Sequence, residues 1–214
     1  MPHKQAEHND LVKNRVPLTS FAWLSIAAAL TTITLKTGAY LMTDSVGLLS
    51  DALESLVNLA GGIMALLMLT IAARPADDIH VYGHSKAEYF ASITEGLLIL
   101  GAAVGIISAA LNRLLQPREL EQLGLGLGVS VAASIVNLIV ARILLREGSA
   151  RRSITLEADA HHLMTDVWTS AGVISGVALA GFTGWGMLDP LIAIAVALNI
   201  IWTGIRLVSR SVAG

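Results

Sequence analysis

Residues 46–72 read VGLLSDALESLVNLAGGIMALLMLTIA, a long stretch in which apolar residues predominate. A helix needs about 20 largely apolar residues to cross a bilayer, and this stretch is long enough. Five more stretches of the same kind occur in the chain, so we expect an all-α membrane protein built as a bundle of six transmembrane helices. The predicted spans are residues 17–41, 46–72, 90–115, 122–145, 154–181 and 187–208.

The overall composition agrees with a chain embedded in lipid. Of its 214 residues, 54% are hydrophobic and only 14% are charged, whereas a soluble domain carries roughly 25% charged residues. The net charge is −2 and no run of Lys or Arg occurs, so nothing favours nucleic acid as a partner. The chain has no cysteine, which excludes disulfides, Cys-based zinc sites and thiol catalysis.

Lys and Arg residues are distributed unequally between the two ends of the predicted helices. If the helices alternate in direction, one side carries only Arg113 and Arg118, while Lys36 falls inside the first span. Because Lys and Arg accumulate in cytoplasmic loops, we predict that both termini and the loops after the second and fourth helices are cytoplasmic. The chain is then a multi-pass inner-membrane protein, with a polar cytoplasmic arm over residues 1–16 and a transmembrane domain over residues 17–210.

Polar and ionisable residues inside the predicted spans are concentrated in the second and fifth helices. Each ionisable group costs roughly 2.5–3.5 kcal/mol to insert into a bilayer, so its position points to function. In both helices three such residues are spaced i, i+3 and i+7: Asp51, Glu54 and Asn58, and Asp159, His162 and Asp166. Each set therefore lies along one face of its helix.

Two residues from each face have the chemistry of metal ligands. Packed helices lie about 8–10 Å apart, and zinc commonly takes four nitrogen or oxygen ligands at about 2.0–2.2 Å. We predict a metal site formed by Glu54, Asn58, His162 and Asp166. The alternative is that these are structural polar groups, hydrogen-bonded to neighbouring helices.

Three neighbours of these ligands are predicted to support the site without binding metal directly: Asp51, Asp159 and His161. For His161, which points about 100° away from His162 on a helix, packing is an equally open role. A further group lies in the loop after the second helix, where Asp77, His80 and His84 are spaced three and four apart. A helical turn or a tight loop would gather them into a second, cytoplasmic metal site; the alternative is that they are solvated loop residues.

These motifs resemble those of the cation diffusion facilitator family over nearly the whole chain after residue 16. The resemblance rests on Ser50-Asp51-Ala52, Pro75-Ala76-Asp77-Asp78, Gly83-His84-Ser85-Lys86-Ala87-Glu88, His162-x-x-x-Asp166 and Asp189-Pro190, which also marks the start of the sixth helix. It implies a transport site at positions 54, 58, 162 and 166, and a second metal site at Asp77, His80 and His84. Members typically export Zn(II), Fe(II), Mn(II), Co(II) or Cd(II) in exchange for protons, usually as homodimers. The implied protein is a secondary transporter, not an enzyme, with metal ions and protons as its partners and no cofactor.

The chain departs from the family pattern in two ways. Many zinc-transporting members have His or Asp followed four residues later by Asp, where this chain has Glu54 and Asn58. A site richer in oxygen shifts preference toward harder ions such as Mn(II) or Fe(II), although zinc also fits. The chain also stops just after the sixth helix, so we expect the usual C-terminal cytoplasmic domain to be absent.

The hypothesis from sequence is proton-coupled export. Metal ligands must be deprotonated, so an incoming ion would displace protons from His162 and from Glu54 or Asp166, which would be reloaded on the other side. A metal sensor or assembly partner without transport is the alternative function. An intramembrane metallohydrolase would also use His and carboxylates, but the chain has no His-Glu-x-x-His motif and no evident Ser or Cys nucleophile.

Overall fold

The computed structural model describes residues 17–72 and 85–213, and they form six long α-helices. These are α2 (Leu18–Thr43), α3 (Val46–Ala72), α4 (Ser85–Leu115), α5 (Leu123–Arg151), α6 (Ile154–Thr183) and α7 (Leu188–Ala213). Each contains a segment long and apolar enough to cross a membrane. The predicted all-α bundle of six transmembrane helices is therefore confirmed, with the predicted spans displaced by a few residues at their ends.

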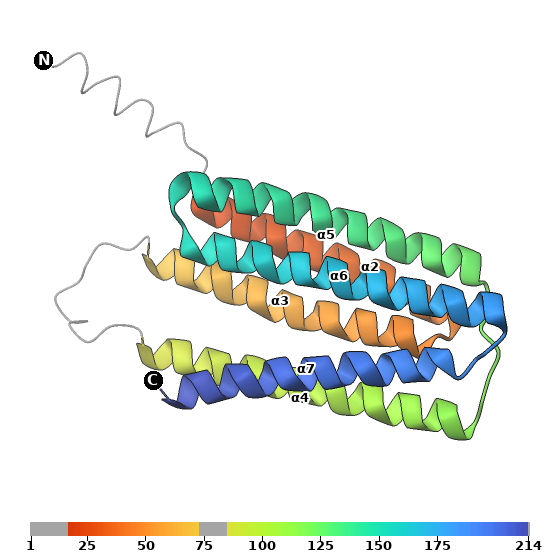
Figure 1. Cartoon of the computed structure of the whole chain (residues 1–214). Coiled ribbons are helices and arrows are strands. Elements are labelled where there is room, and N and C mark those ends of the chain that lie inside the picture. Colours follow the sequence, from red (N-terminus) through yellow and green to blue (C-terminus); the bar gives the residue numbers. More distant parts are fainter. Residues whose placement is uncertain (1–16, 73–84, 214) are drawn as a thin grey trace, which may run out of the picture.

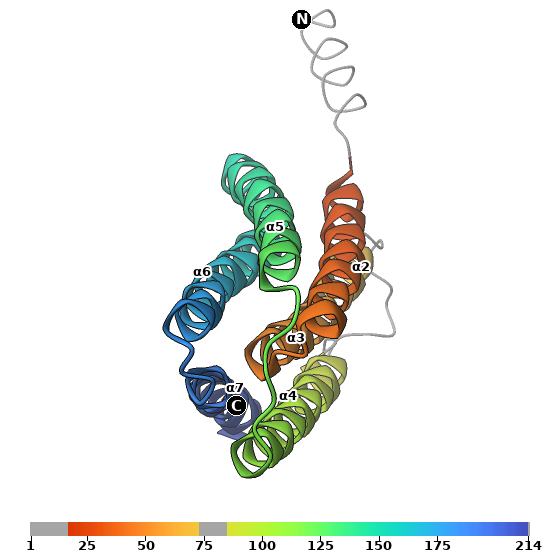
Figure 2. The same cartoon turned by 90° about the vertical axis from the view of Figure 1, so that its right-hand side faces the viewer.

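The six helices form two packed groups (Figures 1 and 2). Helices α2, α3, α5 and α6 pack together, and α4 and α7 pair along their length beside α3. Helix α3 contacts α2, α4, α6 and α7, so it belongs to both groups. Helices α3 and α6 run antiparallel and pack directly against each other (Figure 1).

Large apolar side chains cover the outside of the bundle, while small ones fill much of its interior. Exposed examples are Leu41, Trp168 and Phe182, with 73%, 73% and 90% of their surface accessible. Alanine and serine are frequent among the buried residues, which lets transmembrane helices approach closely. Such a surface suits a lipid environment, because patches of this extent are rare on soluble monomers.

The first turn of α7 is fastened to the start of α3. The Asp189 carboxylate accepts hydrogen bonds from the backbone N–H groups of Val46 (2.8 Å) and Gly47 (2.9 Å) and from the Ser45 hydroxyl. These backbone groups have no partner within their own helix, and a carboxylate is well placed at the positive end of a helix dipole. Asp189 lies in the first turn of α7, as its sequence predicts, but its carboxylate caps α3.

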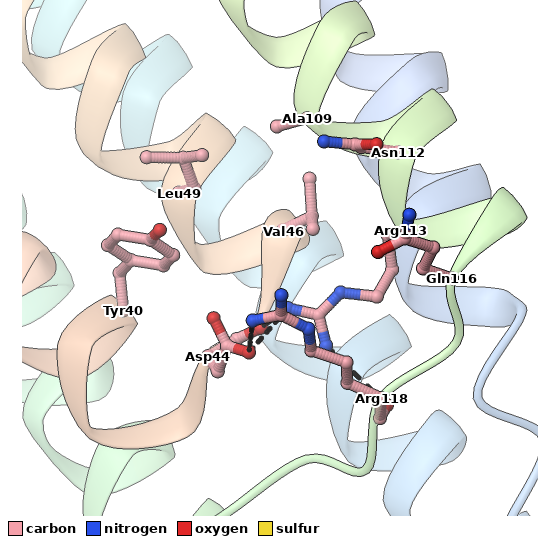
Figure 3. Close-up of a pocket in the computed structure, with 9 residues that line it drawn as sticks. All are labelled: Tyr40, Asp44, Val46, Leu49, Ala109, Asn112, Arg113, Gln116 and Arg118. Carbon is pink, nitrogen blue, oxygen red and sulfur yellow. Dashed lines mark hydrogen bonds and ion pairs between the residues drawn. The ribbon is translucent and has the colours of Figure 1, made fainter.

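The end of α4 is fastened to the same turn (Figure 3). Arg113 forms an ion pair with the Asp44 carboxylate at 2.9 Å and donates a hydrogen bond to the Asp44 carbonyl. Arg118, in the connection to α5, lies 3.7 Å from the same carboxylate. Both helices of the α4–α7 pair are thus joined by polar contacts to the turn between α2 and α3.

Replacing Asp189 should destabilise the bundle measurably. The change Asp189→Ala leaves buried donors at the start of α3 without an acceptor, which costs about 1–3 kcal/mol. Unfolding of the purified protein in detergent micelles should show that loss, whereas Glu119→Ala, at an exposed position of the α4–α5 connection, should change stability by less than about 0.5 kcal/mol. Equal stability of the two variants would contradict the capping role.

Candidate metal site

A cavity of about 280 Å³ lies between α3, α4, α6 and α7. The four residues predicted to bind metal, Glu54, Asn58, His162 and Asp166, all line it. The remaining lining residues are Val57, Ile99, Thr165, Asn199, Ile200 and Thr203. The structure therefore brings the predicted ligands together at one place, inside the membrane-spanning part of the bundle.

Helical spacing explains how these side chains reach the same cavity. Glu54 and Asn58 lie one turn apart on α3, and His162 and Asp166 lie one turn apart on α6. Because the two helices are packed side by side, both pairs face the space between them.

Several polar atoms at this cavity have no hydrogen-bond partner within the described part of the chain. They are Glu54 Oε2, Asn58 Nδ2 and His162 Nε2, all enclosed. Buried polar groups in proteins are normally hydrogen-bonded, so these atoms need water or a bound ion as a partner. The Asn58 amide can turn to present its oxygen instead, since the two ends of an amide have nearly the same shape.

Three carboxylates lie close together at one side of the site. Asp51, Glu54 and Asp166 each place an oxygen so that the three atoms are within 4.8 Å of one another, a grouping able to hold a metal ion. Asp51 is fully buried, and its Oδ2 atom has no partner among the described residues. Asp51 therefore lies next to the predicted ligands Glu54 and Asp166, and its supporting role stays a prediction.

The residue that sequence reasoning missed is Lys36 of α2. Its Nζ atom lies 2.9 Å from Asp51 Oδ1 and 2.8 Å from Asp166 Oδ2, and it donates a hydrogen bond of 2.8 Å to Ser170 Oγ. The side chain is fully buried, with 0% of its surface exposed. The available signal was a lysine inside an apolar span, because such a charge requires a partner.

Neighbouring helices complete this network. The Asn137 amide of α5 donates to Asp166 Oδ2, and the Ser170 hydroxyl of α6 donates to Asp51 Oδ1 at 2.6 Å. Asp166 is therefore held mainly through Oδ2, while its Oδ1 has only a long contact of 3.5 Å with Ser55 Oγ. One oxygen of the predicted ligand Asp166 stays weakly bonded within the described residues.

The other predicted residues are not gathered at the cavity. Asp159 is buried one helical turn from His162 but does not line the cavity, and its Oδ2 has no partner in the described ranges. His161 is exposed on the outer surface of α6. The residues of the predicted loop site, Asp77, His80 and His84, lie outside the described residues, so that site stays a prediction.

A smaller pocket of about 170 Å³ lies at the turn between α2 and α3 (Figure 3). Its charged lining residues are Asp44, Arg113 and Arg118, with both guanidinium groups directed at the one carboxylate. Two positive charges against one negative charge disfavour a cation. The cavity between α3 and α6 is therefore the better candidate.

Known transport proteins are similar to this chain over most of its length. The sequence model of the cation efflux transmembrane domain matches residues 22–213. An uncharacterized transporter of Synechocystis sp. is 56% identical over 192 residues, which are 90% of this chain and 62% of that protein. The cation-efflux pump FieF of Salmonella choleraesuis is 29% identical over 192 residues (90% of this chain, 63% of the pump), and FieF of Salmonella arizonae is 29% identical over 181 residues (85% and 60%). The chain thus spans about three fifths of the length of these curated relatives.

Water access to the cavity can be tested with introduced cysteines, because the natural chain has none. Asn199 lines the cavity, whereas its neighbour Leu198 is 58% exposed on the outer surface of the bundle. A thiol reacts as its thiolate, which needs a polar surrounding. In liposomes, a water-soluble maleimide should therefore label the Asn199→Cys protein about tenfold faster than the Leu198→Cys protein. Equal labelling of the two proteins would argue against a water-filled cavity.

Proposed function

Because this chain belongs to the cation efflux family, we propose that it exports divalent transition-metal ions from the cytoplasm through the cavity between α3 and α6. The observation that carries the proposal is the convergence of Glu54, Asn58, His162 and Asp166 on that single cavity. The protein is a multi-pass inner-membrane protein, whose described residues hold six membrane-spanning helices. The FieF relatives named as cation-efflux pumps support the direction of transport.

The donor atoms favour a divalent transition metal as the substrate. The cavity offers two carboxylates, one imidazole and one amide, and imidazole suits Zn(II), Fe(II) and Co(II) while oxygen donors suit Mn(II). An anion would be repelled by Glu54 and Asp166, so the cavity favours a cation. Zn(II), Fe(II), Mn(II) and Co(II) are therefore the ions to test.

We further propose that export is coupled to proton entry and that the protein works as a homodimer, as the family resemblance implies. Metal ligands must lose their protons before binding, so binding to His162 and to Glu54 or Asp166 releases protons. Movement of the helices then exposes the site to the other side, where protons reload the ligands and expel the ion. The excess of Lys and Arg supports cytoplasmic termini for this direction.

Uptake into proteoliposomes loaded with a metal-sensitive dye tests the proposal. With an imposed pH gradient, the natural protein should transport at least one of the four ions in a saturable way, and His162→Ala should reduce the rate about tenfold or more, because a ligand is lost. The matched control is His161→Ala, which removes an exposed imidazole at the adjacent position and should keep most of the rate.

Two outcomes of this experiment would contradict the proposal. An equal loss of transport rate in His161→Ala and His162→Ala would show that a place at the cavity does not distinguish the histidine needed for transport. Metal binding by the folded protein without uptake of any ion would favour the alternative of a sensor or assembly partner.

The amide at position 58 should set part of the metal preference. The change Asn58→Asp adds a charged oxygen donor to a cavity that already holds Glu54, His162 and Asp166. Affinity for Zn(II) and Mn(II) should rise by about tenfold in calorimetric titrations, since ligand charge strengthens binding of divalent ions. Asn58→Leu should lower this affinity. Tighter binding by Asn58→Leu than by Asn58→Asp would show that Asn58 does not contact the ion.

A further inference from the structure

The α2 ammonium behind the cavity has no role in the export mechanism as described so far. Lys36 uses all three of its N–H donors, on Asp51, Asp166 and Ser170. A lysine near the end of a membrane span extends its charge toward water, but this side chain is fully buried among polar partners. The Lys36 ammonium therefore interacts with the carboxylates and not with solvent.

We propose that the Lys36 ammonium is an intramolecular cation that competes with the transported metal for Asp51 and Asp166 and so keeps metal binding weak enough for release. This inference rests on the proposed function and adds a residue of α2 to it. Lys36 acts as a positioning residue, since it does not line the cavity.

The first reason to expect competition between Lys36 and the metal is charge. Asp51, Glu54 and Asp166, together with Lys36, carry a net charge of −2 when all four are ionised. A divalent ion balances that charge, and without Lys36 the same ion would meet one additional negative charge. Since Coulomb attraction grows strongly inside a protein, removal of the ammonium tightens the hold on the ion.

The second reason to expect this competition is the geometry of the two carboxylates. Lys36 and Asn137 occupy Asp166 Oδ2, whereas among the described residues Oδ1 has only the long contact with Ser55. Asp51 repeats this pattern, because Lys36 and Ser170 occupy Oδ1 while Oδ2 has no partner within the described residues. Each carboxylate thus has one oxygen committed to the ammonium side and one available to an ion, so metal and ammonium share the same two groups and repel each other.

The consequence for transport is a limit on affinity. A transported ion must bind well enough to enter the site and weakly enough to leave it. The ammonium, held in place by three partners, supplies a constant opposing charge without blocking the cavity. Lys36 also keeps Asp51 and Asp166 in fixed positions, which a merely structural lysine would do as well, so the two roles must be separated by experiment.

Calorimetry of metal binding separates the two roles. The full chain in detergent is titrated with Mn(II) and Zn(II) at about pH 8, where protons compete less for the ligands. Lys36→Gln should bind metal about tenfold tighter than the natural protein, because the opposing charge is gone. Lys36→Arg keeps the charge and should bind with nearly natural affinity. In proteoliposomes the Lys36→Gln protein should release metal more slowly and transport at a lower maximal rate.

A second pair of variants covers the case in which Lys36→Gln does not fold with its carboxylates unpaired. Asp51→Asn and the double variant Lys36→Gln with Asp51→Asn differ only by the ammonium and contain one carboxylate fewer. The double variant should bind metal about tenfold tighter than Asp51→Asn alone. Equal or weaker binding in the variants lacking Lys36, with folding preserved, would overturn the competition and leave Lys36 a structural role.

The same measurements distinguish this inference from the proposed function. Tighter binding without Lys36, but no uptake of any ion by the natural protein, would overturn export and keep the competition. Uptake that depends on His162, with affinity independent of Lys36, would overturn the competition and keep export. Absence of metal binding by the natural protein would overturn both.

Discussion

The ion pairs of Lys36 with Asp51 and Asp166 are the constraint on which the arrangement of the bundle depends. A charge inside a bilayer is costly, and a buried ion pair that loses one partner leaves an uncompensated charge. The three residues come from α2, α3 and α6, and Asn137 adds α5 through Asp166. Four helices must therefore stay together for the network to be satisfied, and this fixes the distance and rotation of α3 relative to α6.

The α4–α7 pair is attached to these four helices in a different way. Its contact with α3 is an apolar cluster built from Val57, Ile99, Ala103, Ala197 and Ile200, among others. Packing of this kind has no preferred direction, and in lipid it holds helices together only by close fit. Hydrogen bonds and an ion pair join the pair to the bundle at the turn between α2 and α3. The cavity therefore lies on the boundary between a group fixed by directional polar contacts and a pair held along its length by apolar ones.

Hydropathy and helical periodicity predicted much of this structure because both depend on nearby residues. Apolar runs gave the six helices, and the i, i+3, i+7 spacing placed Glu54, Asn58, His162 and Asp166 on faces that now line one cavity. Helix ends were less accurate, because hydropathy follows the apolar run and not the hydrogen-bonded helix. Helix α4 accordingly begins at Ser85, in a polar segment ahead of the predicted start at residue 90.

The partners of Lys36 and of the first turn of α3 could not be predicted from hydropathy and periodicity. The partner of Lys36 on α6 is 130 residues away, and the carboxylate that caps α3 is 143 residues from Val46. Asn199 and Thr203 also reach the cavity from α7, although neither is ionisable and neither stands out in an apolar span. A single sequence shows that a charge inside an apolar span needs a partner, but it does not show which residue that partner is.

The balance of charge around the cavity links these observations to the choice of ligands. Lys36 reduces the negative charge of the carboxylate group from behind, and Asn58 presents an amide where a carboxylate would add to it. Both residues therefore act on the same quantity, the excess negative charge that an entering cation meets. Lys36 does so through Asp51 and Asp166, whereas Asn58 faces the cavity itself. It follows that neither position can be understood alone, because the charge tolerated at position 58 depends on the ammonium held at position 36.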